Sequence, residues 1–493
     1  MSVRSLSLVL AACAVSACAA TGASTTAEPS APQEPKTLRA GLRATSDPFP
    51  STYRPLPSRP TAIVNANILT GTGQEIRGGT VVMADGKIVS VGPAGTPPAN
   101  AQVIDAAGRW VTPGLIDAHT HLGVYASPGV QALSDGNEAT QPNTAEVWAE
   151  HSIWPQDPGF NRAREGGVTS MLVLPGSANL FGGRSVTLKN VPAVTYQAMK
   201  FPGAPYGLKM ACGENPKRVY GNRNQSPATR MGNAAGFRTG WIAAANYARR
   251  WDRYNESYAE YERKARDGDR EAKEPDPPER NLELDTLAGV LNGEILIQNH
   301  CYRADEMATM IDISKEFKFK IGMFHHASES YKIAPLLARE GICSATWAGW
   351  WGFKLEAFDG IEENAPILHR AGACAVIHSD DANIIQRLNQ ETAAAVSAAN
   401  RAGMNISKAE AIAWITINPA KAMGIGDRTG SLEPGKMADV VLWNRDPFSV
   451  YAQPEQVYVD GALVYDRRDR RYQPRSDFEL GQAGQSGVET GSQ

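Results

Sequence analysis

Two histidines one residue apart, His119 and His121, are the residues of this sequence best placed to do chemistry. They end an extended apolar run that begins at Leu115, after a turn-forming Pro-Gly pair. Successive strand side chains point to opposite faces, so both imidazoles lie on one face, with Asp117 below them. Such a pair at a strand end is suited to bind a divalent metal such as zinc. The alternative is an incidental pair of polar residues.

Histidines also follow later strand-like segments. Of the eight histidines in the chain, five lie at or beside predicted C-terminal strand ends: His119, His121, His300, His325 and His326. The active sites of (β/α)₈ barrels form at that end of the strands. His325 and His326 point to opposite faces of one strand, so we expect only one of them to be a ligand. The spacing to Glu329 favours His326.

A carboxylate ends the last of these segments, at Asp380. Strand parity puts His378 on the same face. We expect His378 either to orient that carboxylate or to be a hydrogen-bonded core histidine. Asp381 alternates outward and is not expected to bind a metal.

Eight strand-like segments could position these side chains, and most of them alternate with helical segments. They are Leu115–His121, Val168–Leu174, Ser185–Leu188, Tyr206–Ala211, Ile295–His300, Lys320–His326, Gly341–Ala345 and Ala375–Asp380. Strands that alternate with helices indicate parallel βαβ units, and eight of them predict an α/β fold with a closed (β/α)₈ barrel. We place this barrel at residues 113–426.

Further strands are expected outside the barrel, at both ends of the chain. Hairpin signals and alternating patterns fall between residues 61 and 105, and again between 430 and 465. Because these strands have no helices between them, we expect 61–112 and 427–472 to form one discontinuous β-sandwich domain. Ser407 and Glu410 form a capping box that opens a helix through Thr416.

An insertion at residues 215–280 interrupts the strand–helix rhythm. Its centre, 240–264, has a helical pattern, with an aromatic stripe on one face: Trp251, Tyr254, Tyr258 and Tyr261. We expect a helix packed on the barrel exterior, with a lid or a contact in a homo-oligomer as alternatives.

The N-terminus has the pattern of an export signal. Arg4 precedes a short apolar run, and Cys13 and Cys18 both end stretches that resemble bacterial lipoboxes. Signal length favours residues 1–18 with a lipid anchor on Cys18, and an ordinary cleaved signal is the alternative. Residues 19–60 and 473–493 are expected to be a disordered tether and tail. These features predict an exported protein, in the periplasm or anchored to the outer membrane.

The remaining cysteines and the charge limit the other functions. Cys212, Cys301, Cys343 and Cys374 form no Cys-x-x-Cys pair, and we expect them to be buried and reduced, although a periplasm would permit a bridge. A net charge of −3 argues against nucleic acid as a partner.

Taken together, these motifs resemble the amidohydrolase superfamily, in the branch of imidazolonepropionase-related enzymes and Xaa-Pro dipeptidases. The resemblance spans about residues 60–470 and rests on five segments in order: Pro113–His121, His300–Glu306, His326–Glu329, Ser379–Asp380 and Gly430–Asp439.

The resemblance implies a role for each candidate residue. His119, His121 and Asp380 would bind one metal, and His300 and His326 a second. Lys209 would be carboxylated and bridge the two metals, with Lys189 and Glu214 as alternatives. Tyr302 and Arg303 would contact a substrate carboxylate.

This inventory predicts a hydrolase that cleaves an amide, peptide or cyclic-amide C–N bond. Two divalent ions, zinc by expectation, about 3.5–4 Å apart would hold a bridging hydroxide. Asp380 would act as general base and then as general acid. A single-metal enzyme similar to imidazolonepropionases or deaminases is the alternative, and a decayed, membrane-tethered binding protein is a third possibility. Four aromatic residues at 347–353 would wall an apolar pocket or plug the fold against the small domain.

Overall fold

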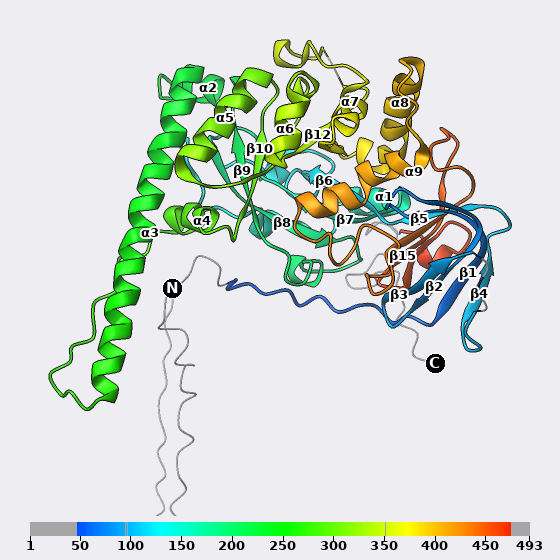
Figure 1. Cartoon of the computed structure of the whole chain (residues 1–493), viewed down its shortest axis with the longest axis horizontal. Helices are drawn as coiled ribbons and strands as arrows, with labels where there is room; N and C mark the ends of the chain where they lie inside the picture. The colour runs from blue at the N-terminus through cyan, green and yellow to red at the C-terminus, as the bar shows by residue number, and fades with distance from the viewer. Residues whose placement is uncertain (1–46, 94, 96, 351, 475–493) are drawn as a thin grey trace, which may run out of the picture. The chain divides into compact units, whose positions relative to one another are not determined.

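The computed structural model describes residues 47–474, except 94, 96 and 351. All eight predicted barrel strands are present and form one sheet in chain order (Figure 1). They are β6 (Leu115–Thr120), β7 (Val168–Val173), β8 (Phe181–Lys189), β9 (Gly207–Ala211), β10 (Leu296–His300), β11 (Ile321–His325), β12 (Cys343–Thr346) and β13 (Cys374–Ile377). Between the first and last strand, Asp380 N–H donates to His119 C=O at 2.9 Å, and Ser379 N–H donates to Asp117 at 3.2 Å. These bonds bring the ends of the sheet together into a nearly closed barrel.

One strand runs against the expectation of an all-parallel barrel. β8 pairs antiparallel with both β7 and β9. Only residues 174–180 connect β7 to β8. A parallel crossover needs about a dozen residues or more, so this connection can form only a hairpin.

Helices follow the strands and cover the outside of the barrel (Figure 1). They are α1 (Pro158–Glu165), α4 (Leu282–Leu291), α5 (Ala304–Phe317), α6 (Ala334–Glu340), α7 (Asn364–Arg370), α8 (Leu388–Arg401), α9 (Lys408–Ala411) and α10 (Ile417–Ala422). The predicted capping box at the start of α9 is present. Thr416 separates the 3₁₀ turn after α9 from α10, which carries Pro419 in its first turn, where no helical N–H is lost.

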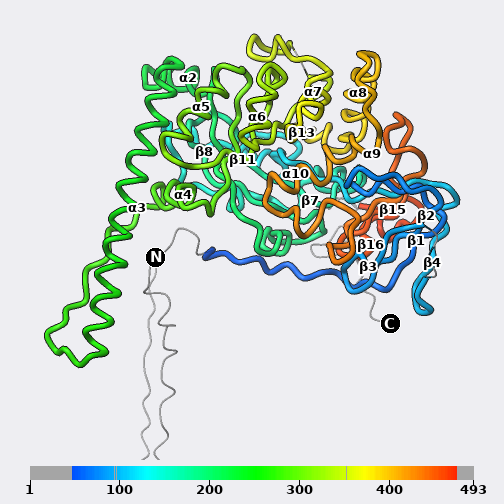
Figure 2. Tube along the Cα trace, in the orientation of Figure 1, coloured from blue at the N-terminus to red at the C-terminus, as the bar shows by residue number. Residues whose placement is uncertain are grey.

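The second sheet is built from both ends of the chain, as predicted (Figure 2). The N-terminal part supplies β1 (Thr61–Leu69), β2 (Glu75–Ala84), β3 (Lys87–Gly92), β4 (Gln102–Asp105) and β5 (Trp110–Pro113), and the C-terminal part supplies β14 (Val440–Trp443), β15 (Pro454–Val459) and β16 (Ala462–Asp466). The chain passes from this sheet to the barrel at Gly114. A Cβ there would lie 2.1 Å from Thr169 Oγ1, so only glycine fits this passage.

A buried ion network joins the second sheet to the barrel. Lys189 Nζ lies 3.1 Å from Asp439 Oδ1 and 2.8 Å from Asp460 Oδ1. The Tyr53 hydroxyl also donates to Asp460. Tyr53 belongs to residues 47–60, which fall within the expected tether but lie against the fold, where Lys200 Nζ pairs with Asp47 at 2.7 Å.

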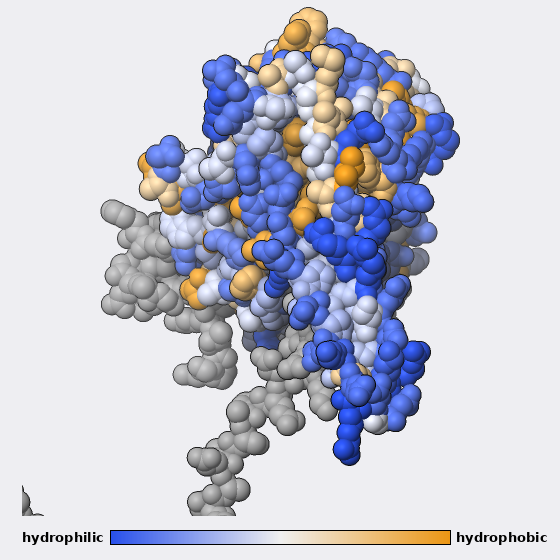
Figure 3. All heavy atoms as spheres, turned by 90° about the vertical axis from the view of Figure 1, so that its left-hand side faces the viewer, coloured by the Kyte–Doolittle hydropathy of each residue, from blue (hydrophilic) through white to orange (hydrophobic). Residues whose placement is uncertain are grey.

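The insertion contains α2 (Glu214–Gly221) and one long helix, α3 (Arg230–Arg266). α3 begins ten residues before the predicted helix. Gly236 and Gly240 weaken the helical pattern there, but a Cβ at either would clash with Leu180 or Phe181, so they permit close packing on the β7–β8 hairpin. The second half of α3 projects beyond the strands, and its outer surface is largely hydrophilic (Figures 1 and 3). The predicted aromatic stripe is present, with neighbouring ring centroids 5.7–5.9 Å apart.

The four cysteines of the described residues form two disulfides, so the expectation that they are reduced is wrong. Cys212 pairs with Cys301, and Cys343 pairs with Cys374. Each pair joins neighbouring strands of the barrel: the first lies just after β9 and β10, and the second at the starts of β12 and β13. Residues that are far apart in the sequence are brought together by the sheet order, and sequence spacing does not reveal such pairs.

The predicted signal, both lipobox-like cysteines and most of the tether lie outside the described residues, as does the tail from 475 onward. Among the described residues, no helix is both long and apolar enough to cross a membrane.

Candidate metal centre

Three predicted ligands meet at the C-terminal ends of β6 and β13. His121 Nε2 lies 3.2 Å and His119 Nε2 3.3 Å from Asp380 Oδ1, and the two Nε2 atoms are 3.4 Å apart. His119 is fully buried, whereas the Asp380 side chain keeps 24% of its exposure and can meet a substrate. Asp380 has a φ of 62°, in the left-handed region that non-glycine residues rarely occupy. Backbone strain of this kind concentrates at functional sites.

The hydrogen bond of His121 Nδ1 shows which nitrogen of this ring carries the proton and which carries the lone pair. His121 Nδ1 lies 2.8 Å from Leu174 C=O, and a carbonyl can only accept, so Nδ1 carries the proton. A neutral ring then presents a lone pair at Nε2 toward the Asp380 carboxylate. Two acceptors 3.2 Å apart can share a cation between them. The donor set therefore fits a divalent metal.

A second set of histidines lies beside the first. His300, His326 and His378 are buried. Both ring nitrogens of His300 and His378, and Nδ1 of His326, have no hydrogen-bond partner among the described residues. A buried polar group without a partner costs about 1–3 kcal/mol, so five such nitrogens at one place are suited to a metal. Ring atoms of His119, His326 and His378 lie within 4.8 Å of one another, close enough to share an ion.

His378 fits neither of its two expected roles. A hydrogen-bonded core histidine would have partners, and His378 has none in the described chain. No hydrogen bond to Asp380 is present there either. The ring lies 4.8 Å from the His326 ring and 5.2 Å from the His119 ring. His378 thus lies among the candidate ligands.

Side chains alternate between the two faces of the sheet only within β11, and this alternation ends before His326. β11 ends at His325, and His326 has a φ of 57°. This turn breaks the alternation, so both rings face the interior and contact His119, at centroid distances of 4.7 and 4.4 Å. The two rings differ in their hydrogen bonding. His326 lies among the unpartnered histidines, whereas both nitrogens of His325 are hydrogen-bonded.

Lys209 lies inside the barrel, next to His119. Its Nζ is 3.0 Å from Pro175 C=O and 3.4 Å from His119 Nε2. Burial lowers the pKa of Lys209 to about 7, although Asp380 opposes this shift. Of the two alternatives, Lys189 belongs to the network at the second sheet, and Glu214 forms an ion pair with Lys354.

The lowered pKa of Lys209 predicts a pH-dependent stability of the metal-free protein. Between pH 7 and 10.5 the unfolded chain holds a proton on this lysine that the folded protein lacks, so the free energy of unfolding rises with pH. The slope from this group is at most about 1.4 kcal/mol per pH unit, and the stability is lost as the pH falls toward 7. Lys209→Met should remove this slope in urea unfolding at pH 7–9, in bicarbonate-free buffer. Equal slopes in the two proteins would contradict a buried neutral amine.

The two predicted substrate contacts differ in their surroundings. Tyr302 is buried, its ring lies 4.9 Å from His300 and 5.6 Å from His326, and burial raises the pKa of its hydroxyl well above 10. Tyr302 therefore presents a neutral hydroxyl group at the centre. Arg303 lies outside the cluster, because its guanidinium is half exposed and binds Asp305 through two hydrogen bonds of 2.9 Å.

The aromatic loop after β12 packs on the histidines. Trp347 stacks on His326 at 4.7 Å and contacts Trp350 at 5.3 Å, and Phe353 lies 6.3 Å from Tyr302. These ring contacts are with His326, with Tyr302 and within the loop, so the loop covers the histidines. Trp351 is outside the described residues.

Two residues at the centre were missed from the sequence. Lys354 Nζ lies 3.9 Å above the Tyr302 ring. The Tyr125 ring lies 5.5 Å from His121, in the long loop after β6. Neither belongs to a recognisable motif, and both come from loops, whose course the sequence does not reveal.

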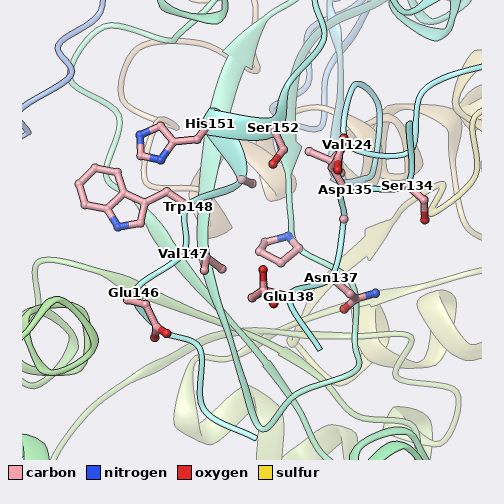
Figure 4. Close-up of a pocket in the computed structure, with 13 residues that line it drawn as sticks. Val124, Ser134, Asp135, Asn137, Glu138, Glu146, Val147, Trp148, His151 and Ser152 are labelled. Carbon is pink, nitrogen blue, oxygen red and sulfur yellow. The ribbon is translucent and has the colours of Figure 1, made fainter. Parts of the chain in front are cut away.

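A pocket of about 510 Å³ lies beside the centre (Figure 4). Pro175 belongs to its wall, and the carbonyl of Pro175 accepts the hydrogen bond from Lys209. The loop after β6 supplies most of the other walls, including the carboxylates of Asp135, Glu138 and Glu146. The candidate metal ligands are not among the residues that line this pocket, and Pro175 is its link to Lys209.

Known proteins are similar to this chain in sequence. The sequence profile of the amidohydrolase family matches residues 356–464. Amidohydrolase tasK of Hapsidospora irregularis is 32% identical over 438 residues, which make up 83% of this chain, whereas this chain spans only 43% of tasK. An imidazolonepropionase of Mesorhizobium japonicum is 24% identical and aligns over 74% of this chain and 86% of its own.

A solved structure is similar to this chain over its own full length. The crystal structure of an amidohydrolase from Thermotoga maritima MSB8 superimposes with a TM-score of 0.71 at 34% identity, over 83% of this chain and 100% of that one. The two proteins thus share a fold, and in this chain a histidine cluster lies at the barrel strand ends. The chain belongs to the amidohydrolase family of hydrolases.

Proposed function

We propose that this protein is a metal-dependent hydrolase that cleaves an amide, peptide or cyclic-amide C–N bond in a small molecule. The observation that carries the proposal is the convergence of His119 Nε2, His121 Nε2 and Asp380 Oδ1 within 3.2–3.4 Å. The neighbouring unpartnered histidines support a second ion. The imidazolonepropionase relative favours cyclic amides among the substrates to be tested.

In the proposed hydrolysis, different residues would bind the metal ions, transfer the proton and exclude water. When bound, divalent ions polarise the substrate carbonyl and lower the pKa of a water molecule. His119 and His121 would hold one ion, and His300 and His326 the other. Asp380, the most exposed of the three converging groups, would take the proton from the attacking water and deliver it to the leaving nitrogen. Trp347 covers His326 and would keep bulk water from that side.

Lys209 favours two metals over one. Its amine is neutral above a pH of about 7 and can add to carbon dioxide, which forms an N–C bond and releases one proton. The resulting carbamate is an anion that two ions can share. A single-metal enzyme would have no use for such a bridge, and a bare buried ammonium group would be costly.

A substrate screen tests the proposed activity. Zinc-reconstituted protein should hydrolyse at least one class among N-acyl amino acids, Xaa-Pro dipeptides and lactams, and a chelator should reduce the rate to background. The rate should return when zinc is added back. Hydrolysis that persists in the metal-free protein would contradict the proposal.

Export is proposed as well. Disulfides persist in oxidising compartments, and the two pairs here agree with the signal-like N-terminus. In cells fed a labelled fatty acid, the full chain should be labelled, and Cys18→Ala should abolish the label. Label retained in that variant would show that Cys18 is not the lipidated residue.

A further inference from the structure

A chain of hydrogen bonds runs through the barrel interior behind His119. Gln298 Nε2 lies 3.3 Å from Ala422 C=O, at the end of α10. Gln298 Oε1 lies 2.8 Å from His325 Nε2. His325 Nδ1 lies 2.8 Å from His119 Nδ1. The chain thus links a helix outside the barrel to a candidate metal ligand.

The donors and acceptors of these hydrogen bonds can be assigned one after another, beginning at the Ala422 carbonyl. The carbonyl of Ala422 only accepts, so the amide nitrogen of Gln298 faces it, and Gln298 Oε1 faces His325. That oxygen also only accepts, so His325 Nε2 carries a proton.

The proton on His325 Nε2 also fixes the tautomer of His119, the candidate metal ligand. A neutral His325 with its proton on Nε2 has a lone pair on Nδ1 and accepts the proton of His119 Nδ1–H. His119 therefore presents a lone pair at Nε2, the atom that lies 3.3 Å from Asp380 Oδ1.

The burial of these three side chains disfavours any other placement of the protons on His325 and His119. Gln298, His325 and His119 are each no more than 1% exposed. Among the described residues, the hydrogen-bond partners of the His325 ring are Gln298 and His119, and neither is a carboxylate that would stabilise a second proton. Bulk water cannot replace either neighbour of His325 in this interior.

We propose that Gln298 and His325 are positioning residues that set the tautomer of His119 and thereby prepare its Nε2 to bind a metal. The proposal rests on His119 being a metal ligand, as the proposed function holds. Groups that hold the second nitrogen of a ligating histidine typically change metal affinity by about 10–100-fold when they are removed. His325 thus contributes hydrogen bonds to the site, while its neighbour His326 would hold the second ion.

Zinc affinity, measured by competition with a chelating dye, tests the role of His325. His325→Leu removes the acceptor at nearly constant volume and should raise the Kd for zinc about 10–100-fold, whereas His325→Asn keeps an acceptor near the Nδ1 position and should stay within about threefold of the wild type. Gln298→Met should have a smaller effect of the same sign, because His325 then loses its fixed direction. Equal Kd values for His325→Leu and His325→Asn, at matched melting temperatures, would overturn the proposal.

The tautomer itself can be read by NMR of ¹⁵N-histidine-labelled full chain, with and without zinc. His325 should carry its proton on Nε2 alone in both forms. A proton on Nδ1 of His325 would overturn the relay, since His325 would then donate to His119. If the wild type binds no zinc, the proposed function fails, while the tautomer of His325 in the metal-free protein still decides the relay.

Discussion

Asp380→Asn should lower kcat/KM for amide hydrolysis by at least about 10³-fold. General acid–base catalysis contributes about 10²–10⁴-fold, and Asp380 also faces two candidate ligands. Asparagine keeps an oxygen for the metal but cannot accept a proton at neutral pH. Most of the loss should therefore appear in kcat, with zinc still bound.

The adjacent acid provides a matched control. Asp381 accepts the backbone N–H groups of Asn383 and Ile384 at 2.7 and 2.9 Å and has no contact with the histidines in the described structure. Asp381→Asn should leave kcat/KM within about twofold of the wild type, because asparagine keeps an oxygen that can accept the same two backbone N–H groups. If the two variants lost activity equally, Asp380 would not be the proton carrier.

His119→Ala should abolish both metal binding at its site and hydrolysis. His119 Nε2 lies within 3.4 Å of His121, Asp380 and Lys209, so it faces more of the proposed ligands than any other side chain described here. The loss of zinc affinity should exceed the 10–100-fold that is typical for removal of an outer hydrogen-bond partner. Competition with a chelating dye measures the affinity, and the substrate found in the screen measures the activity.

His369 is the control for a general effect of removing a histidine. It lies on α7, is partly exposed and contacts Glu410 at 3.4 Å, away from the cluster. His369→Ala should keep full zinc content and activity. Unchanged zinc affinity and hydrolysis in His119→Ala would show that the site is misplaced.

Much of the fold could be predicted because its strands are apolar, short and separated by clear turn signals. All eight barrel strands lie within or close to their predicted ranges, and the sheet shared by both chain ends followed from strands without helices between them. The antiparallel direction of β8 was missed, although the connection after β7 is too short for a parallel crossover. The extra length of α3 was missed because glycine normally weakens a helix, while here Gly236 and Gly240 permit close packing.

The convergence of the candidate ligands could be predicted, whereas their neighbours were predicted less well. His119, His121, Lys209 and Asp380 do meet, because motifs at strand ends converge in a barrel. The left-handed backbone at His326 was not visible, so the role of His325 in the interior was missed. Gln298 precedes His300 by two residues on the same strand face, and this was a usable signal.

Contacts between distant segments were beyond the reach of sequence spacing. Cys212 and Cys301 meet only because β9 and β10 are neighbours, and 89 residues separate the two cysteines. Lys354 reaches Tyr302 from a loop of irregular course. The sequence alone does not predict loop geometry, which depends on the final packing.

The metal content of the purified full chain tests the central claim most directly. After reconstitution with zinc and bicarbonate and removal of free metal, elemental analysis should find two zinc ions per chain, and anomalous diffraction should place one beside His119, His121 and Asp380 and the other beside His300 and His326. One ion per chain would contradict the two-metal centre, and none would contradict a metal centre altogether.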